Sequence, residues 1–297
     1  MSYCKKKTFK LAVVCLMVCF SVEIEAQITD LARIEYSFIP KRKSEDRYTR
    51  LRALLNYPIE IKEDAYLVLG GEYNHVILDL DDKYNFETTP LETLHIIDFS
   101  VGYTFKMSEH WRVGAKINPR VASTLTEDFS INDMFLNGGV FFIKDRLDAT
   151  DIKRPYRIIL GLTYNATTGI PFPLPFVSYF RNFRENWSFT LGVPKSNLKH
   201  SFTENQNIQA FLSLDGYYAH IQKPSIINGK SVDNISLSVL VGGLGYEYEF
   251  TKHLFAYSYF GYTFRLNNVL RNENRDEVIT LDDVNTLYLR TGLKFKI

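Results

Sequence analysis

Apolar and polar residues alternate along most of this chain with a period of two. The segment Leu94–Lys106, LHIIDFSVGYTFK, has bulky side chains at every second position from His95 to Phe105, with mostly polar or small residues between them. A period of two is typical of a β-strand with two unlike faces. A four-residue turn, Met107–His110, separates this segment from a second alternating run that begins at Trp111. The two runs therefore predict a β-hairpin.

The same alternation recurs throughout the chain. It is found in five further segments: Arg50–Tyr57, Tyr156–Asn165, Trp187–Val193, Leu240–Phe250 and Thr286–Ile297. Most of the ten prolines lie at the ends of such runs or between them, where a hydrogen-bonded ladder tolerates them. No convincing amphipathic helix is present. The pattern predicts an all-β protein with many antiparallel strands.

The connections between the runs alternate between short and long ones. The short ones include Met107–His110, Asn182–Asn186 and Thr251–His253. Short turns at one end and long polar loops at the other are typical of a transmembrane β-barrel. Both chain ends then belong at the short-turn end, which requires an even number of strands. Counting Asn197–Thr203 as a short strand gives about fourteen; twelve is the alternative if Pro171–Arg181 folds differently.

The final segment, TLYLRTGLKFKI, predicts how this antiparallel barrel closes. It should pair with the first strand near Arg33–Phe38 and leave no free edge. Its two faces give opposite expectations. Lipid should contact Leu289, Leu293, Phe295 and Ile297, and the lumen or its mouth should receive Arg290, Lys294 and Lys296.

The first 26 residues predict a secretory signal peptide. A basic start with four lysines precedes Leu11–Val22, a run of twelve mostly apolar residues. This run is too short for a spanning helix, which needs about 20 residues. Residues 27–297 would then form a single outer-membrane barrel domain. All three cysteines, at positions 4, 15 and 19, lie in the leader, so the mature chain has neither disulfides nor a thiol nucleophile.

Net charge and aromatic content indicate which kinds of partner the protein has. The chain has 35 basic and 34 acidic residues, and loss of the leader's four basic and two acidic residues leaves a net charge of −1, which gives no case for nucleic acid. The predicted partners are outer-membrane lipid, the barrel-insertion machinery during biogenesis and small solutes. The alternative is a secreted soluble β-protein, whose apolar face would point inward. Aromatic residues near strand ends, such as Tyr103, Trp111 and Tyr246, resemble a girdle at a lipid–water interface and favour the membrane.

In a barrel of this kind, the polar face of each strand lines the lumen. The register places fourteen charged candidates there: Arg50, Arg52, Glu72, Asp98, Arg112, Lys116, Arg120, Arg157, Asp215, Glu247, Glu249, Arg265, Arg290 and Lys294. One interpretation is a pore with a mild preference for anions. The other is that these charges pair across the interior and partly close it.

No catalytic, cofactor or metal site is indicated by the sequence. The six histidines show no metal-ligand spacing, and there is no phosphate-binding loop. His200 and Ser201 are adjacent, and outer-membrane lipid hydrolases use a His/Ser pair. Neighbouring strand residues point to opposite faces, however, which is unsuitable for a hydrogen-bonded dyad. We therefore expect no enzyme, no cofactor and no metal.

Three stretches resemble a known family. They are RIEYSFIP at Arg33–Pro40, GIPFPLPFVSYFRNFRENWSFTLGVPKSNLKHSF at Gly169–Phe202 and VGGLGYEYEFTKHLFAYSYFGYTFRL at Val241–Leu266. Together they are similar to an uncharacterised family of outer-membrane β-barrel proteins, with a domain of unknown function, that is common in Bacteroidota. The resemblance spans nearly the whole mature chain and implies fold and location, but no activity. Ile297 departs from the Phe or Trp on which many such barrels end.

The resulting hypothesis is an outer-membrane barrel that acts as a small passive pore or as a structural membrane protein. An alternative class is a surface-recognition protein that works through three long loops, at Tyr84–Glu92, Leu125–Asp133 and Asn267–Asp283. A lipid-acting enzyme is the least favoured reading. The dipeptide Asn228-Gly229 predicts a tight hairpin whose strands extend beyond the membrane.

Overall fold

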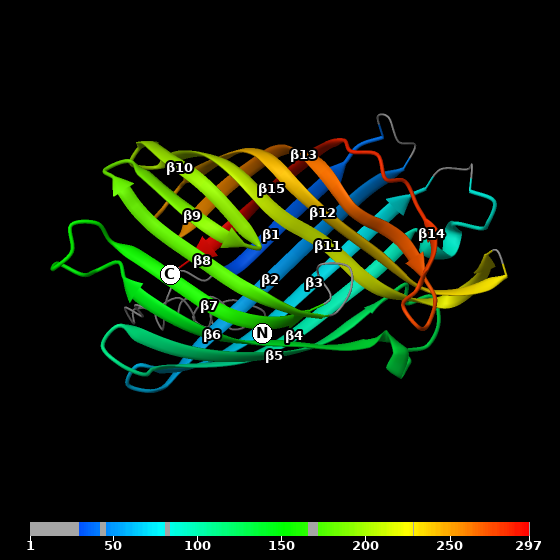
Figure 1. Ribbon diagram of the computed structural model, residues 1–297, viewed down its shortest axis with the longest axis horizontal. Helices are drawn as coiled ribbons and strands as arrows, with labels where there is room; N and C mark the ends of the chain where they lie inside the picture. The colour runs from blue at the N-terminus through cyan, green and yellow to red at the C-terminus, as the bar shows by residue number, and fades with distance from the viewer. Residues whose placement is uncertain (1–29, 42–45, 81–83, 166–171, 228, 297) are drawn as a thin grey trace, which may run out of the picture.

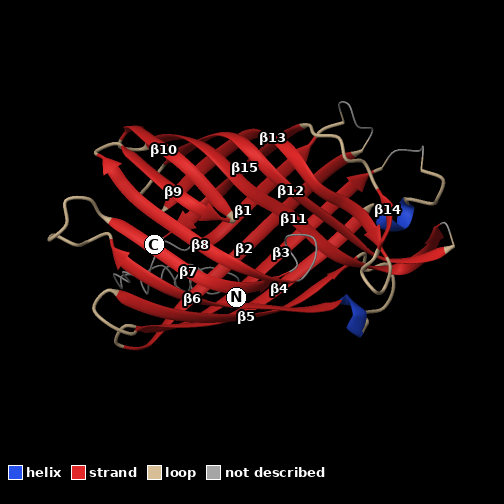
Figure 2. Cartoon of the chain, viewed as in Figure 1, coloured by secondary structure: helices blue, strands red, loops and turns tan. Residues whose placement is uncertain are grey.

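The computed structural model describes residues 30–41, 46–80, 84–165, 172–227 and 229–296. The predicted signal peptide, residues 1–26, lies outside these ranges. The described residues fold into a closed barrel of strongly tilted strands (Figure 1), and strands make up nearly all of its regular structure (Figure 2). In this part of the chain, no helix is long and apolar enough to cross a membrane.

Fifteen strands and two short 3₁₀ helices make up the described structure. In chain order they are β1 (Asp30–Ile39), β2 (Arg47–Lys62), β3 (Ala65–Asp79), η1 (Thr89–Leu91), β4 (Thr93–Lys106), β5 (Trp111–Ser123), η2 (Ile131–Asp133), β6 (Met134–Arg146), β7 (Tyr156–Asn165), β8 (Phe172–Arg184), β9 (Trp187–Val193), β10 (Lys195–Thr203), β11 (Gln206–Ile227), β12 (Lys230–Glu249), β13 (Leu254–Arg271), β14 (Glu277–Thr280) and β15 (Leu287–Lys296). Of these, β14 pairs only with β13, and the other fourteen strands form the antiparallel wall. The predicted count of fourteen is confirmed, including the short strand β10.

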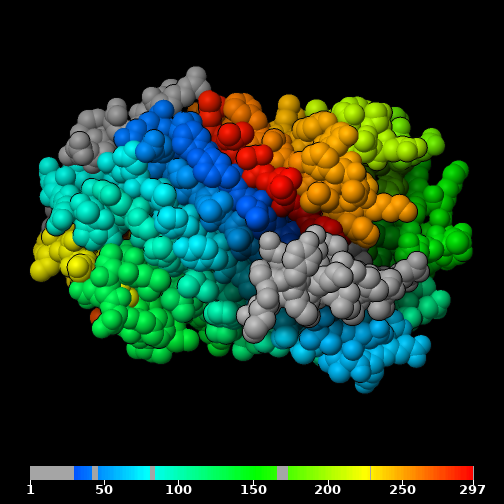
Figure 3. Space-filling view, turned by 180° about the vertical axis from the view of Figure 1, so that it is seen from behind, coloured from blue at the N-terminus to red at the C-terminus, as the bar shows by residue number. Residues whose placement is uncertain are grey.

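The barrel closes where its first and last strands meet. β15 lies between β13 and β1, and its pairing with β1 runs from Asp30 opposite Lys296 to Phe38 opposite Leu289. From behind, β15 is seen as a band between the segments of β1 and β13 (Figure 3). The closing pair predicted from the final segment is confirmed, and this seam has no free sheet edge.

The outer wall of the barrel is apolar. On β15, Leu289, Leu293 and Phe295 are 39%, 49% and 43% exposed, whereas Lys294 between them is buried in the interior. An apolar surface that continues around the wall suits lipid, because soluble proteins rarely expose contiguous apolar patches of that size. The predicted faces of Leu289, Leu293, Phe295 and Lys294 are confirmed, and Ile297 lies outside the described residues.

Most short turns lie at one end of the barrel and most long connections at the other, and we call these the short-turn end and the long-loop end (Figure 1). The connection at residues 147–155, between β6 and β7, is a longer one at the short-turn end. β11 and β12, of 22 and 20 residues, form the longest hairpin, which extends at the long-loop end. Gly229 at its tip has a φ of +75°, while Asn228 lies outside the described residues. The predicted loop Asn267–Asp283 is shorter than expected, because β13 continues to Arg271 and Glu277–Thr280 forms β14.

The interior of the long-loop half is filled by apolar side chains, which differs from the expectation of a polar lumen throughout. β1 to β5 and β11 to β13 contribute to this apolar core, which includes Ile39, Tyr48, Val76, Leu78, Leu94, Ile96, Tyr217, Ala219, Ile221, Ile235, Leu237, Val239 and Leu270. The inner face packs against the opposite wall. This close packing of apolar side chains excludes water.

β11 brings the two sides of the apolar core together. The ladder between β10 and β11 ends where Lys195 faces Ser213. Further along, β11 reaches β5, where the amide of Thr124 donates to the carbonyl of His220 at 3.1 Å. Residues 215–219 of β11 are buried whichever face they are on. β11 thus crosses the long-loop end and closes it over the interior.

The ladder between β12 and β13 depends on a pair of glycines. Gly243 faces Gly261, and a Cβ added at Gly243 would lie 2.1 Å from the carbonyl oxygen of Phe260. We predict that Gly243→Ala destabilises the barrel by about 1–3 kcal/mol through overpacking. The measurement is the temperature at which the folded form is lost in detergent. Gly71→Ala is the matched control, because nothing lies within 4 Å of its added Cβ. Equal unfolding temperatures for the two variants would contradict this account.

Candidate functional site

Two buried carboxylates lie at the centre of the lumen among arginines from two strands. Asp215 on β11 accepts hydrogen bonds from both terminal nitrogens of Arg50 on β2, at 2.9 and 2.8 Å, and pairs with Arg290 on β15. Glu35 on β1 lies 3.6 Å from Arg290 and 3.9 Å from Arg50. Arg52 on β2 is also 3.9 Å from Glu35. These five residues form the central cluster, and they meet because closure places β1 between β2 and β15.

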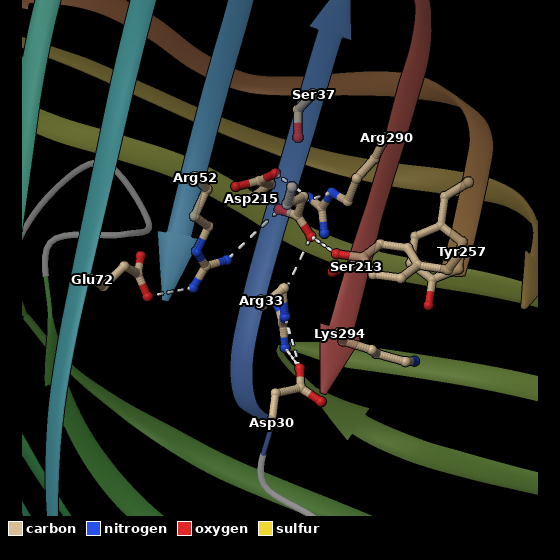
Figure 4. Close-up of polar contacts among 12 residues, drawn as sticks. Asp30, Arg33, Ser37, Arg52, Glu72, Ser213, Asp215, Tyr257, Arg290 and Lys294 are labelled. Atoms are coloured by element: carbon tan, nitrogen blue, oxygen red, sulfur yellow. Dashed lines mark hydrogen bonds and ion pairs between the residues drawn. The ribbon is translucent and has the colours of Figure 1, made fainter. Parts of the chain in front are cut away.

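Tyrosine hydroxyls contact both carboxylates of the central cluster, and Figure 4 shows Tyr257, Arg290 and Asp215 converging beside β1. Tyr257 on β13 donates to Glu35 at 2.6 Å, and Tyr288 on β15 donates to Asp215 at 3.2 Å. A buried carboxylate is costly unless it is both paired and hydrogen bonded. Because Asp215 comes from β11 and its partners come from β2 and β15, the cluster ties opposite sides of the wall together.

A second cluster surrounds Glu247 on β12. Its carboxylate accepts hydrogen bonds from Lys294 at 2.7 Å and from Lys199 at 3.2 Å. The hydroxyl of Tyr259 donates at 2.8 Å and the amide of Gln209 at 3.2 Å. We call these five residues the Glu247 cluster. Five strands meet here, β10 to β13 and β15, and because they are neighbours in the sheet, the cluster joins adjacent strands of the wall.

A cavity of about 260 Å³ lies beside the central cluster and is open to solvent. β2 to β7 form most of its wall, and Asp215 with Gly216 of β11 forms the remainder. Two ion pairs stand on this wall, one between Arg52 and Glu72 at 2.7 Å and one between Arg120 and Asp98 at 2.8 Å. Lys116 on β5 also lines the cavity, and its side chain is exposed within it. We call this space the lumen cavity.

Two of the predicted lumen residues lie at the short-turn end instead. Arg112 on β5 donates to the carbonyl of Asp64, at 2.9 Å, in the turn between β2 and β3. Arg157 on β7 donates to Asp145 on β6 at 2.7 Å. Both arginines therefore hold neighbouring strands together near their ends, outside the central and Glu247 clusters.

The last two predicted residues stand apart from the clusters. Arg265 on β13 pairs with Asp282, at 3.1 Å, in the connection at the long-loop end. Glu249 is half-buried at the short-turn end of β12. The structure brings ten of the fourteen candidates together in the clusters and the lumen cavity: Arg50, Arg52, Glu72, Asp98, Lys116, Arg120, Asp215, Glu247, Arg290 and Lys294.

The sequence analysis missed several members of these clusters. Glu35 had a usable signal, because it stands between the apolar Ile34 and Tyr36 in RIEYSF and must point inward with its neighbours outward. Tyr257 and Tyr259 had no such signal, because tyrosines occur on both faces of this barrel. Their inward direction follows from the register of β13 with β12 and β15.

At the long-loop end, Asp133 anchors η2 to the β11–β12 hairpin. Its carboxylate accepts hydrogen bonds from the backbone amide of Ser130 and from the side chain of Gln222, both at 2.8 Å. Burial opposes ionisation, but hydrogen bonds from Ser123, Ser130 and Gln222 outweigh it and hold the pKa of Asp133 below its usual range. The loop that precedes β6 is thereby fastened to the hairpin.

The His200–Ser201 pair is separated in the structure. The ring of His200 stacks on Trp187 with centroids 4.4 Å apart, while the hydroxyl of Ser201 donates to Asn207. Among the described residues, no group of three or more His, Cys, Asp or Glu side chains could hold a metal ion.

The closed antiparallel wall, with lipid-suited side chains outside and charges within, defines the class of transmembrane β-barrel proteins. The particular family follows from the sequence. Residues 22–296 match the domain of unknown function DUF6268, so this chain belongs to the DUF6268 family. No curated protein matches the sequence.

Solved barrel structures show distant likeness. The NanC porin is 11% identical over 90% of this chain and 100% of its own, with a TM-score of 0.38. LpxR from Salmonella typhimurium is 10% identical over 90% of this chain and 99% of its own, with a TM-score of 0.40. The translocator domain of the autotransporter NalP from Neisseria meningitidis is 10% identical over 98% of each chain, with a TM-score of 0.36. Nothing about activity or substrate follows from likenesses at this level.

The central cluster predicts a strong dependence on Asp215. In Asp215→Asn, Arg50 and Arg290 stay buried without their closest anionic partner, so we expect a loss of about 3–5 kcal/mol in unfolding free energy. Urea titration of the barrel in lipid vesicles measures the loss. Asp79→Asn is the control, because that side chain is 36% exposed and its pair with Arg47 at the rim is worth at most about 1 kcal/mol. Losses of the same size in both variants would refute a central role for Asp215.

Proposed function

We propose that the protein is an outer-membrane barrel that admits small solutes into a polar lumen but is closed at its long-loop end at rest. It is then a restricted, solute-selective barrel rather than a general diffusion pore. Lipid contacts its outer wall, and the barrel-insertion machinery assembles it. The apolar core is the observation that carries this proposal, because it occupies the interior where an open pore needs a water-filled path.

The charges of the lumen favour anionic solutes. In the described residues, the two clusters and the lumen cavity together hold seven cationic and five anionic side chains. Most of these charges are paired, which narrows the lumen and limits the excess positive charge to a few sites. A mild preference for anions agrees with that balance.

Surface recognition is a second candidate, supported by the long-loop end. The loop before β6 and the β11–β12 hairpin are joined through Gln222, and they expose Phe129, Ile131 and Ile226 to 58%, 76% and 80%. Exposed apolar side chains on joined loops are typical of contact surfaces. For catalysis we propose no role, because His200 and Ser201 each have other partners.

Conductance in planar bilayers tests the closed end. We expect the wild-type barrel to give little steady current after insertion. Tyr217 and Leu237 face each other in the apolar core, so Tyr217→Ala with Leu237→Ala should open a path and raise the conductance at least several-fold, with anion selectivity in a salt gradient.

The control for this experiment also removes one leucine and one aromatic side chain, but from the outer wall. Leu244 and Phe260 also face each other, and they are 59% and 58% exposed toward lipid. Leu244→Ala with Phe260→Ala should leave the current unchanged. A wild-type current as large as that of the core variant would show that the apolar core does not close the barrel.

A further inference from the structure

We propose that the lumen cavity binds a small hydroxylated monocarboxylate, with Lys116 as the residue that receives the carboxylate. This inference rests on the proposed function, because it requires that solutes enter the lumen. The site lies along β2 to β7, beside the central cluster.

Charge pairing singles out Lys116. Three of the four cations that line the cavity have a carboxylate partner: Arg50 with Asp215, Arg52 with Glu72 and Arg120 with Asp98. Lys116 is the fourth, and its ammonium makes no hydrogen bond or ion pair with the described residues. The cavity therefore has one uncompensated positive charge, exposed to its interior. One positive charge suits a ligand with one negative charge.

Further polar atoms around the cavity indicate the rest of the ligand. The side-chain oxygen of Asn137 is buried and has no hydrogen-bond partner among the described residues, although Asn137 is only 6% exposed. The ε-nitrogen of Arg52 is likewise unpaired there. Asn118 and Ser100 add further donors and acceptors to the same wall. Buried polar atoms without partners are rare, and hydroxyl groups, which donate and accept, satisfy both kinds.

The size of the cavity limits the ligand. Its volume of about 260 Å³ is below the roughly 300–1,000 Å³ of drug-sized pockets, so it fits a small organic molecule. On the β6 wall, Gly139 is closely packed, since a Cβ there would lie 3.0 Å from the side chain of Thr163 and would crowd this side of the cavity. A sugar acid of about six carbons combines this size with one carboxylate and several hydroxyls.

Calorimetric titration of the full-length barrel in detergent tests the site with three probes. Gluconate has the carboxylate and the hydroxyls, sorbitol has only the hydroxyls, and acetate has only the carboxylate. We expect gluconate to bind at least tenfold more tightly than either of the others. Lys116→Gln should weaken gluconate binding at least tenfold, and Lys116→Arg, which keeps the charge, should retain most of it.

Lys144→Gln is the matched control, because Lys144 lies on the outer face of β6, over the ring of Trp111, and should leave gluconate binding unchanged. Sorbitol binding as tight as gluconate binding, or no effect of Lys116→Gln, would overturn the carboxylate role. Acetate binding as tight as gluconate binding would overturn the hydroxyl contacts. Binding in detergent needs no path through the barrel, so a conducting wild type that still binds gluconate through Lys116 would refute only the closed long-loop end.

Discussion

Backbone hydrogen bonding in an apolar environment is the constraint on which the rest of this structure depends. A backbone amide or carbonyl without a partner in lipid costs several kcal/mol, so a sheet that spans a membrane must close on itself. Here closure is the pairing of β15 with β1. It fixes the direction of every side chain along the seam, which is why Leu293 lies on the outer wall while Lys294 reaches the interior. Side-chain chemistry on the two faces follows from that one pairing.

Closure also determines which charges meet. Residues that are far apart in sequence become neighbours across the lumen, as with Arg50 and Asp215, which are 165 residues apart. Inside a closed wall these charges are shielded from bulk water, so each must find a partner or remain costly. The central and Glu247 clusters are the result, and they stiffen the barrel while they narrow it. Solute access is then confined to the space that the clusters leave, which is the lumen cavity.

Much of this architecture could be predicted from the sequence, because its signal is local. Alternation gave the strands and their faces, the parity of short and long connections gave the strand number, and TLYLRTGLKFKI gave the closing pair. For the site, alternation identified Lys116 and Asp215 as inward-facing. Alternation could not predict which charges pair. Pairing depends on strand tilt and on register across the lumen, and the sequence of a single strand determines neither.

The apolar core could not be predicted for a related reason. At residues 215–219, DGYYA, the period of two is lost, because Tyr217 and Tyr218 are both buried on a strand that has left the lipid-facing wall. The ladder with β10 ends near Ser213, and only the distant contact with β5 shows where β11 continues. An inward strand needs apolar residues on both faces, whereas a wall strand needs them on one. The same hydrophobicity that suits the outer wall to lipid therefore closes the lumen wherever a strand turns inward. In this barrel β11 is the strand that turns inward, so β11 determines whether the long-loop end is closed or open.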